Sequence, residues 1–131
     1  MIMSYQEIKD SLYPREEKLI EIDNFEECPP GDVRAVLSRC LDHLVPGGEV
    51  EFGVLNWQWC TEYIQVHSGP DIKLSEILFD GKRRSLWTEK KIAIELLQSG
   101  FHRVWTGKVL EQPEYLLWTK GLKKPEQKGG G

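Results

Sequence analysis

The most regular hydrophobic pattern in the chain lies between two segments rich in proline and glycine, residues 29–31 and 46–48. Apolar residues recur there at the spacing of one helix face, which predicts an amphipathic helix over residues 33–44 with Asp32 as its N-cap. The recurring residues are Val33, Val36, Leu37, Cys40, Leu41 and Leu44. The Pro46-Gly47-Gly48 segment predicts the turn that ends this helix.

Two segments beside this helix have the patterns of strands. Residues 18–22 are short, apolar and partly β-branched, and residues 49–55 alternate Val50, Phe52 and Val54 with charged or small residues. The acidic segment 23–31 between the first strand and the helix is predicted to be a loop.

The rest of the chain predicts three further elements. Ser4 and Glu7 have the spacing of a capping box, so we expect a short helix that ends before Pro14. Thr88 is expected to cap a second helix that ends at Gly100. Residues 101–110 and 115–120 are rich in aromatic residues and predict an antiparallel hairpin. Residues 56–85 are irregular, with two short helices expected near 61–66 and 74–79.

This alternation of strands and helices predicts an α/β fold with parallel strands and an antiparallel hairpin at one edge. We expect three parts in the chain: an N-terminal helical arm over residues 1–14, one α/β domain over 15–121, and a disordered tail over 122–131. The tail is polar and ends in three glycines.

Composition places the chain among ordinary globular domains. The 131 residues carry 17 basic and 21 acidic side chains, a net charge of −4, which argues against general nucleic-acid binding. No apolar stretch is long enough for a membrane helix and no secretory signal begins the chain, so we expect a cytoplasmic protein. Acidic groups dominate residues 1–62 and basic groups dominate 63–131, which allows the halves to attract each other.

Cysteine usage and motif scanning exclude several kinds of site. Cys28, Cys40 and Cys60 are too far apart for a zinc motif, so we expect no metal, and an odd number of cysteines favours reduced thiols. The sequence has no nucleophile elbow, no phosphate-binding loop and no zinc-protease motif.

The order of elements, together with particular residues, resembles the C-terminal half of class I S-adenosylmethionine-dependent methyltransferases, of the type 11 kind. The resemblance rests on an aspartate after the first long strand, a Pro-Pro segment before the helix, Pro46-Gly47-Gly48 before the next strand, and Ser99-Gly100-Phe101 before the closing hairpin. It spans about residues 17–120. It implies a partial Rossmann-like sheet whose strands correspond to strands 4-5-7-6 in the family order 3-2-1-4-5-7-6.

The N-terminal half of that family has no counterpart in this sequence. In the family, the first strand leads into a Gly-x-Gly-x-Gly loop that lets the backbone approach the cofactor. Outside the terminal triplet, no two glycines of this chain have that spacing, and Glu27 replaces the histidine that follows the fourth strand. The resemblance therefore implies a fold without most of its cofactor pocket.

The resemblance places Asp23 and Glu26 where the family meets cofactor and substrate. An acidic loop in solvent, with Glu26 or Asp32 capping the helix, is the simpler reading of the same residues. Basic residues 82–84 could hold a phosphate or an acidic sugar, although a turn in solvent is the commoner role of such a run.

Aromatic residues crowd the segment after the second strand. Trp57, Trp59, Tyr63 and His67, together with Arg84, could form a pocket for a methyl acceptor, and core packing explains the aromatic residues equally well.

The sequence is compatible with two functions. One is a non-catalytic binding or assembly subunit that needs no cofactor. The other is an S-adenosylmethionine-dependent methyltransferase that a partner chain, or a second copy, completes in trans.

The resemblance also implies an exposed strand edge. Without strands one to three, the segment from Leu19 to Ile22 becomes an edge strand, so we expect a homodimer or a partner protein to pair there. The alternative is that residues 13–18 fold back as an extra strand and leave a monomer.

Overall fold

A computed structural model of the chain describes residues 1–11, 16–66, 76, 81–84 and 87–126. These residues form a five-stranded mixed sheet in the order β1-β2-β3-β5-β4, with β1, β2 and β3 parallel and β5 antiparallel to both β3 and β4. The strands are β1 (Ile2–Met3), β2 (Glu17–Ile22), β3 (Leu44–Leu55), β4 (Arg103–Gly107) and β5 (Leu116–Leu122).

This sheet confirms the α/β class and the strand order that the resemblance implied. The order β2-β3-β5-β4 corresponds to strands 4-5-7-6, and the final hairpin is antiparallel as expected. In chain order the last two strands are neighbours, yet β5 lies between β3 and β4 and pairs with β3 over seven residues, which makes it a central strand.

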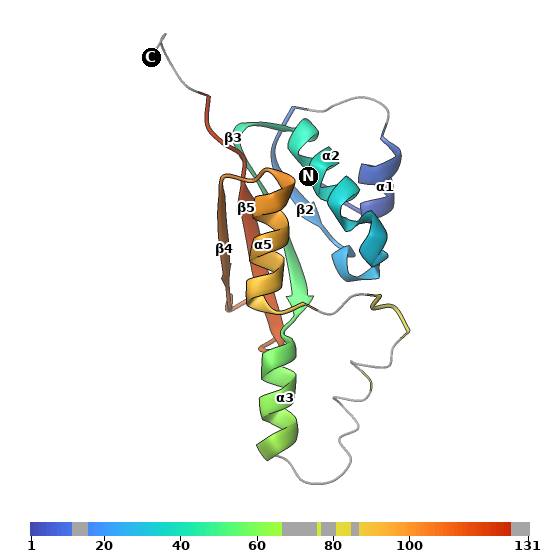
Figure 1. Cartoon of the computed structure of the whole chain (residues 1–131), viewed down its shortest axis with the longest axis vertical. Coiled ribbons are helices and arrows are strands. Elements are labelled where there is room, and N and C mark those ends of the chain that lie inside the picture. The colour runs from blue at the N-terminus through green and yellow to red at the C-terminus, as the bar shows by residue number, and fades with distance from the viewer. Residues whose placement is uncertain (12–15, 67–75, 77–80, 85–86, 127–131) are drawn as a thin grey trace.

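Three helices cover one face of the sheet, and a fourth lies beyond one end of it (Figure 1). The covering helices are α1 (Tyr5–Asp10), α2 (Val33–His43) and α5 (Glu89–Ser99), and the fourth is α3 (Trp57–Val66). Two short 3₁₀ turns, η1 (Phe25–Glu27) and η2 (Pro30–Asp32), connect β2 to α2. The helix expected near residues 74–79 lies outside the described residues, Glu76 excepted. In the part of the chain that the structure describes, no helix has the length and apolarity to cross a membrane.

The core fills the space between the sheet and its covering helices. Ile20, Val50, Phe52 and Val54 point from β2 and β3 toward the helices and are fully buried. From α2 and α5, the residues that the helical pattern marked meet them: Val36, Leu37, Cys40, Ile92 and Leu96. Leu97, which also follows the pattern, is about half exposed, so the apolar face of α5 is narrower than expected.

The four expected cap residues, Ser4, Asp32, Thr88 and Gly100, lie at the ends of the helices where the sequence predicts them. The Ser4 hydroxyl accepts a hydrogen bond from Glu7 N at 3.1 Å, and Thr88 Oγ1 accepts one from Lys91 N at 3.2 Å. Gly100 ends α5 with φ of 111°, a left-handed conformation that favours glycine. Asp32 is the N-cap of α2, as expected, but its side chain makes no capping hydrogen bond, and its carboxylate instead contacts Lys9 Nζ of α1 at 3.0 Å.

The expected turn at Pro46-Gly47-Gly48 lies inside a strand. β3 begins at Leu44, which pairs with Glu17, but the next pairs join Leu19 to Glu49, so β3 bulges outward between them. Gly47 has φ of +81°, and a Cβ at Gly48 would lie 2.9 Å from Val45 O and 3.1 Å from two carbonyls of β2. The two glycines therefore let the bulge close against the neighbouring strand.

The segment from Leu19 to Ile22 is not the edge of the sheet. β1 pairs with its carboxyl half through Ile2 and Met3, and Met1 contributes two further backbone bonds, from its amino group to Leu19 O at 3.0 Å and from Glu21 N to its own carbonyl at 2.9 Å. The expected fold-back of residues 13–18 is also wrong, because residues 17 and 18 belong to β2 itself. A segment before α1 provides the extra strand instead.

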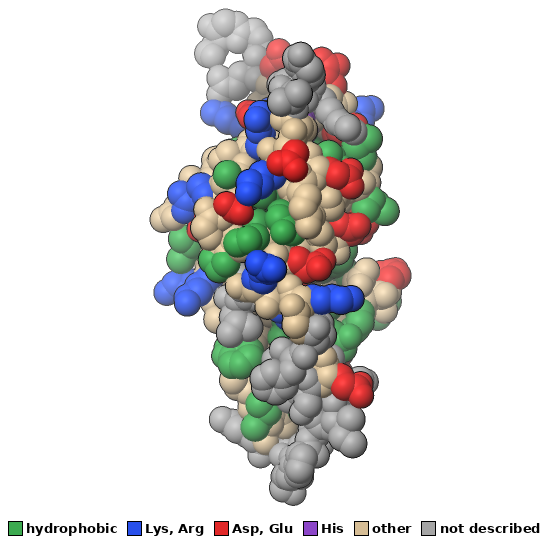
Figure 2. Space-filling model, turned by 90° about the vertical axis from the view of Figure 1, so that its right-hand side faces the viewer, with side chains coloured by type: hydrophobic (Ala, Val, Ile, Leu, Met, Phe, Trp, Pro, Cys, Tyr) green, Lys and Arg blue, Asp and Glu red, His purple; other side chains and the backbone are tan. Residues whose placement is uncertain are grey.

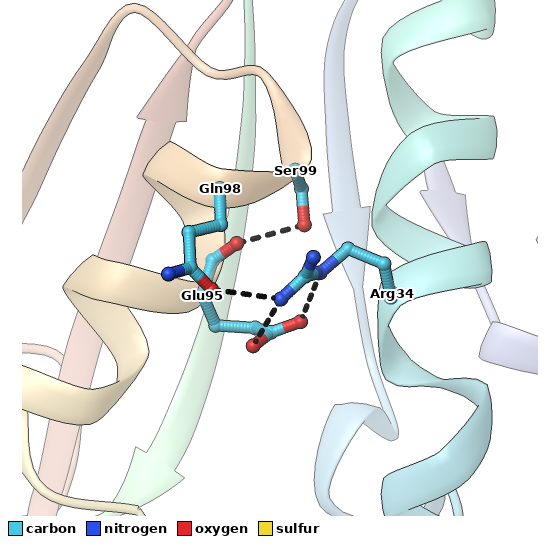
Figure 3. A network of polar contacts seen from close by, with 4 residues as sticks. All are labelled: Arg34, Glu95, Gln98 and Ser99. Atoms are coloured by element: carbon cyan, nitrogen blue, oxygen red, sulfur yellow. Dashed lines mark hydrogen bonds and ion pairs between the residues drawn. The ribbon is translucent and has the colours of Figure 1, made fainter.

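Polar contacts fasten the covering helices to one another. The Arg34 guanidinium on α2 bonds both carboxylate oxygens of Glu95 on α5, at 2.6 and 3.1 Å, and the side-chain oxygen of Gln98 at 3.0 Å (Figure 3). Ser99 Oγ donates to the backbone carbonyl of Glu95 at 2.7 Å, which ties the last turn of α5 together (Figure 3). This fork geometry aligns the two helices at the protein surface.

Ordered structure continues beyond the expected domain boundary at residue 121. β5 ends at Leu122, and Lys123 N donates to Gly48 O at 2.8 Å. The Lys123 ammonium donates to Leu41 O at 2.7 Å and Leu44 O at 2.8 Å, so it satisfies carbonyls at the end of α2. His43 in the same turn is fully buried, with Ser11 Oγ 2.6 Å from its Nε2.

Ion pairs of both senses join the two halves of the chain. Arg83 contacts Glu26 at 3.1 Å and Lys120 contacts Glu51 at 4.0 Å, in each case a basic group of the second half with an acid of the first, whereas Arg34 with Glu95 has the opposite sense. Figure 2, viewed from the side on which α1 and α2 lie, shows acidic, basic and hydrophobic side chains interspersed over the surface.

Candidate functional site

The candidate site is a hollow at the carboxyl ends of β2 and β3. Since these two strands are parallel, their carboxyl ends meet at one edge of the sheet, which is where ligands bind in open α/β folds. The hollow measures about 360 Å³, and a smaller one of about 160 Å³ adjoins it around η1. Both are lined by Asp23, Glu26, Gly53 and Arg83, and the larger also by Glu21, Ile22, Gln112, Leu116 and Trp118.

Glu26 is fixed in this hollow by an ion pair. The residue is 9% exposed, and Oε2 lies 3.1 Å from Nε of Arg83, whose side chain is also largely buried. Arg84 N donates to Glu26 O at 2.8 Å, so backbone and side chain both join η1 to the segment 81–84. The expectation of a solvated acidic loop is therefore wrong for Glu26, and that of a solvated basic turn is wrong for Arg83.

The neighbouring aromatic residue explains why η1 holds Glu26 in place. Phe25 is fully buried and stacks on Phe52 of β3, with ring centroids 3.9 Å apart. Trp87 packs against the same ring at 5.8 Å. Because Phe25 anchors the short turn in the core, the next residue is directed into the hollow.

Asp23, the other predicted acid, lies at the rim. It is exposed, and its backbone N donates to Met3 O at 3.1 Å, so β1 fixes the chain at this point. The structure therefore brings Asp23 and Glu26 to one hollow, as the sequence predicted, with one carboxylate paired and the other at the surface.

The predicted aromatic residues Trp57, Trp59 and Tyr63 belong to α3 and form a cluster separate from the hollow. Trp59 stacks on Tyr63 at 4.9 Å and packs against Tyr115 at 6.1 Å, and with Trp57 they cover Leu55 and Cys60. This arrangement supports the packing interpretation, and none of these residues lines either hollow. His67 lies outside the described residues. Arg84 is exposed, and its backbone N donates to Glu26 O, so a methyl-acceptor pocket that joins Arg84 to the aromatic cluster and His67 stays a prediction.

Sequence reasoning missed Trp118, Gly53 and Gln112 as lining residues of the hollow. Gly53 and Trp118 are direct partners in the β3–β5 register, and a Cβ at Gly53 would lie 3.2 Å from the six-membered ring of Trp118. The signal in the sequence was Gly53 at an outward position of an otherwise regular strand, which often marks a place where another group approaches closely.

The structure allows a test of whether this chain can cradle S-adenosylmethionine. β1 lies beside β2, which is the position of strand one in the family order, but β1 leads through Ser4 directly into α1. Two of the first three N–H groups of α1 are already bonded, Tyr5 N to Asn24 Oδ1 at 2.8 Å and Glu7 N to Ser4 Oγ at 3.1 Å. Asn24 Nδ2 also donates to Gln6 Oε1 at 2.8 Å. This strand end has no glycine loop, and the bonded N–H groups of Tyr5 and Glu7 are not available to a ligand, so these residues do not fit the cofactor.

Other chemistry at the described residues is limited. No three His, Cys, Asp or Glu side chains gather into a metal-binding group in the described part of the chain. The three thiols are buried and free, and burial raises the pKa of Cys28 to about 11 and that of Cys40 to about 12. A thiol with such a pKa is a weak nucleophile at neutral pH.

Comparison with solved structures identifies the fold. A putative O-methyltransferase from Nostoc punctiforme aligns with a TM-score of 0.63 at 12% identity, over 88% of this chain and 34% of that chain. A possible histamine N-methyltransferase from Thermotoga maritima aligns with a TM-score of 0.58 at 14% identity, over 89% and 61%. A Burkholderia thailandensis 1,6-didemethyltoxoflavin-N1-methyltransferase, with S-adenosylhomocysteine bound, aligns with a TM-score of 0.58 at 13% identity, over 89% and 48%.

These structures share the Rossmann-like fold of S-adenosylmethionine-dependent methyltransferases. The chain spans only part of their length, from about a third to three fifths in these three, so it matches a portion of that fold. No protein-family model and no curated protein matches the sequence.

Proposed function

We propose that this chain is a binding or assembly module with the substrate-side portion of a methyltransferase fold and no S-adenosylmethionine site of its own. The observation that carries this proposal is the closed end of β1. In the family, a glycine loop at that place receives the cofactor, whereas here Ser4 and Asn24 bond the N–H groups of α1. A cofactor would have to break these bonds without a replacement cradle.

Calorimetry with S-adenosylmethionine on the purified chain tests the proposal. We expect no saturable heat at ligand concentrations up to about 1 mM, which is the weakest affinity that such an experiment readily detects. A complete methyltransferase in the same buffer serves as the positive control. Saturable binding with a micromolar dissociation constant would overturn the proposal.

The second candidate is a methyltransferase completed in trans, and the acidic hollow favours it. Asp23 and Glu26 still line an open space at the carboxyl ends of β2 and β3, where a partner could bring the cofactor and a methyl acceptor. Methyl transfer is mainly a matter of positioning, so a shared site between two chains is chemically sufficient. β1 occupies the position beside β2, so a partner strand would have to displace it or pair beyond it.

A pull-down followed by a methyl-transfer assay with labelled S-adenosylmethionine tests this candidate. A trans-completed enzyme predicts a partner with a Gly-x-Gly-x-Gly segment and activity that Asp23→Ala lowers. Asp42→Ala, at an exposed position on α2, is the matched control. Lack of both the partner and the activity would remove this candidate and leave the calorimetric test unaffected.

A further inference from the structure

The sheet has a second face, opposite α1, α2 and α5, that no described helix covers (Figure 1). Residues that pair across neighbouring strands form rows on this face. Leu19, Glu49, Leu122 and Arg103 form one row across β2, β3, β5 and β4, and Glu21, Glu51, Lys120 and Trp105 form the next. All eight side chains are half-buried or exposed, whereas their neighbours along β2, β3 and β5 point into the core. We call these eight residues the open face.

Charge divides the open face along the middle of the sheet. The β2–β3 half carries Glu21, Glu49 and Glu51 with no basic side chain in the two rows, and the β5–β4 half carries Lys120 and Arg103 with no acid. One contact crosses the division, between Lys120 Nζ and Glu51 Oε2 at 4.0 Å. Burial raises the pKa of Glu51, and the carboxylates of Glu49 and Glu21 raise it further, whereas Lys120 lowers it. The three carboxylates of the acidic half therefore repel one another within one chain.

Apolar groups occupy the same rows. Trp105 on β4 is 47% exposed and Leu19 on β2 is 37% exposed, at the two outer strands of these rows. Around Trp105 the face is hollowed, over about 350 Å³, between Glu49, Arg103, Lys120 and Leu122. Large exposed apolar side chains beside a hollow are typical of a surface that a partner covers.

We propose that this open face binds a second copy of the chain, with the two sheets packed face to face about a two-fold axis parallel to the strands. Such an axis places β2 of one copy on β4 of the other and β3 on β5, and each row faces the same row of the second copy. Glu51 then faces Lys120 of the second copy, and Glu21 faces Trp105 of the second copy. The acidic half of each chain covers the basic half of the other.

Charge excludes the other in-plane axis. A two-fold axis perpendicular to the strands would place β2 on β2 and β3 on β3, so three carboxylates would face three carboxylates, and like charges in contact cost several kcal/mol. The observed division of charge thus selects one arrangement. The open face adjoins the hollow of the candidate site, with which it shares Glu21, but the proposal goes beyond the binding role proposed above because it does not depend on S-adenosylmethionine.

The size of the face sets the expected affinity. The eight residues form two rows about 7 Å apart across four strands about 4.8 Å apart, so with their side chains they cover roughly 250 Å² on each copy. Two such patches cover roughly 500 Å² in total, well below the 1,200 Å² or so of specific, stable interfaces. A weak dimer with a dissociation constant of about hundreds of micromolar is therefore expected, and the measurement must reach such concentrations.

Analytical ultracentrifugation of the full chain, from about 5 to 500 μM, tests the proposal. We expect a monomer–dimer equilibrium that weakens by roughly three-fold or more when salt rises from about 50 to 500 mM, because the paired charges are partly exposed. A chain that stays monomeric at the highest concentration would overturn the proposal, as would binding of a different protein to this face with no dimer at any concentration.

Charge-reversal variants test whether the open face forms the dimer. Lys120→Glu and Glu51→Lys, each alone, are expected to raise the dissociation constant at least ~10-fold, since Glu51 of one copy faces Lys120 of the other and either change places like charges together. The double variant Glu51→Lys with Lys120→Glu restores opposite charges at both positions and is expected to return to within about three-fold of the unaltered chain. Circular dichroism checks that each variant is folded.

Two apolar variants complete the test. Trp105→Ser should weaken the dimer by a similar factor, whereas Leu97→Ser, at an exposed leucine on the opposite side of the molecule, should leave it unchanged. A dimer that responds to Leu97→Ser but not to Trp105→Ser would contradict the proposal. So would a double charge variant as weak as the two single variants.

Discussion

At the scale of single residues, the Glu26–Arg83 pair distinguishes this site from the surface ion pairs. Glu26→Ala would leave the largely buried Arg83 guanidinium without this carboxylate, and we expect the free energy of unfolding to fall by about 2–4 kcal/mol. Glu114→Ala, which breaks an exposed contact with Lys108, should cost under ~0.5 kcal/mol. Urea denaturation measures both, and equal effects would contradict the buried role of Glu26.

Thiol reactivity is a second property of single residues. Since burial raises the pKa values of Cys28 and Cys40 to about 11 and 12, the folded chain should react with a disulfide reagent at about pH 8 much more slowly than the chain unfolded in guanidinium chloride. Above the ordinary thiol pKa of 9.0, the unfolded chain loses protons that the folded chain keeps. The free energy of unfolding should therefore fall as pH rises through this range, and less so in Cys40→Ala.

At the scale of elements, Lys123 fastens the end of α2 to the end of β5. Lys123→Met keeps most of the apolar stem but removes both hydrogen bonds to the helix carbonyls, so we expect a loss of about 1–3 kcal/mol in the free energy of unfolding. Lys124→Met, at the exposed next residue, should change it by less than ~0.5 kcal/mol. Chemical denaturation of the two variants provides the measurement, and a similar result for both would show that the contact is not stabilising.

For the whole molecule, the N-terminal segment closes the sheet and part of the core. A chain without residues 1–10 loses β1 and the buried side chains of Met3 and Ile8, and it exposes the backbone edge of β2. We expect a melting temperature at least ~10 °C lower and species larger than those of the full chain. Ile8→Ala should lower the melting temperature but keep the size distribution, because β1 remains. Light scattering during the melt separates these outcomes.

Local patterns in the sequence determined the covering helices and four of the five strands, whereas the order of the strands followed only from the resemblance to the methyltransferase family. Helical spacing and capping residues specify these elements because they depend on neighbours a few positions apart. The predicted boundary between the strand 18–22 and the loop that follows also placed Asp23 and Glu26 at the carboxyl end of the first long strand, the edge where the hollow lies.

Only the tertiary structure decided which distant groups meet. Arg83 lies 57 residues from Glu26, and Asn24 lies 19 residues from Tyr5, so no local period relates either pair. β1 has two residues, too few to show an alternating pattern, and it forms because β2 offers an unpaired edge beside it. Likewise, the pairing of β3 with β5 places Glu51 beside Lys120, and with it the division of charge across the open face. Which side chains are neighbours across strands depends on strand order and register, and these are fixed only when the whole sheet forms.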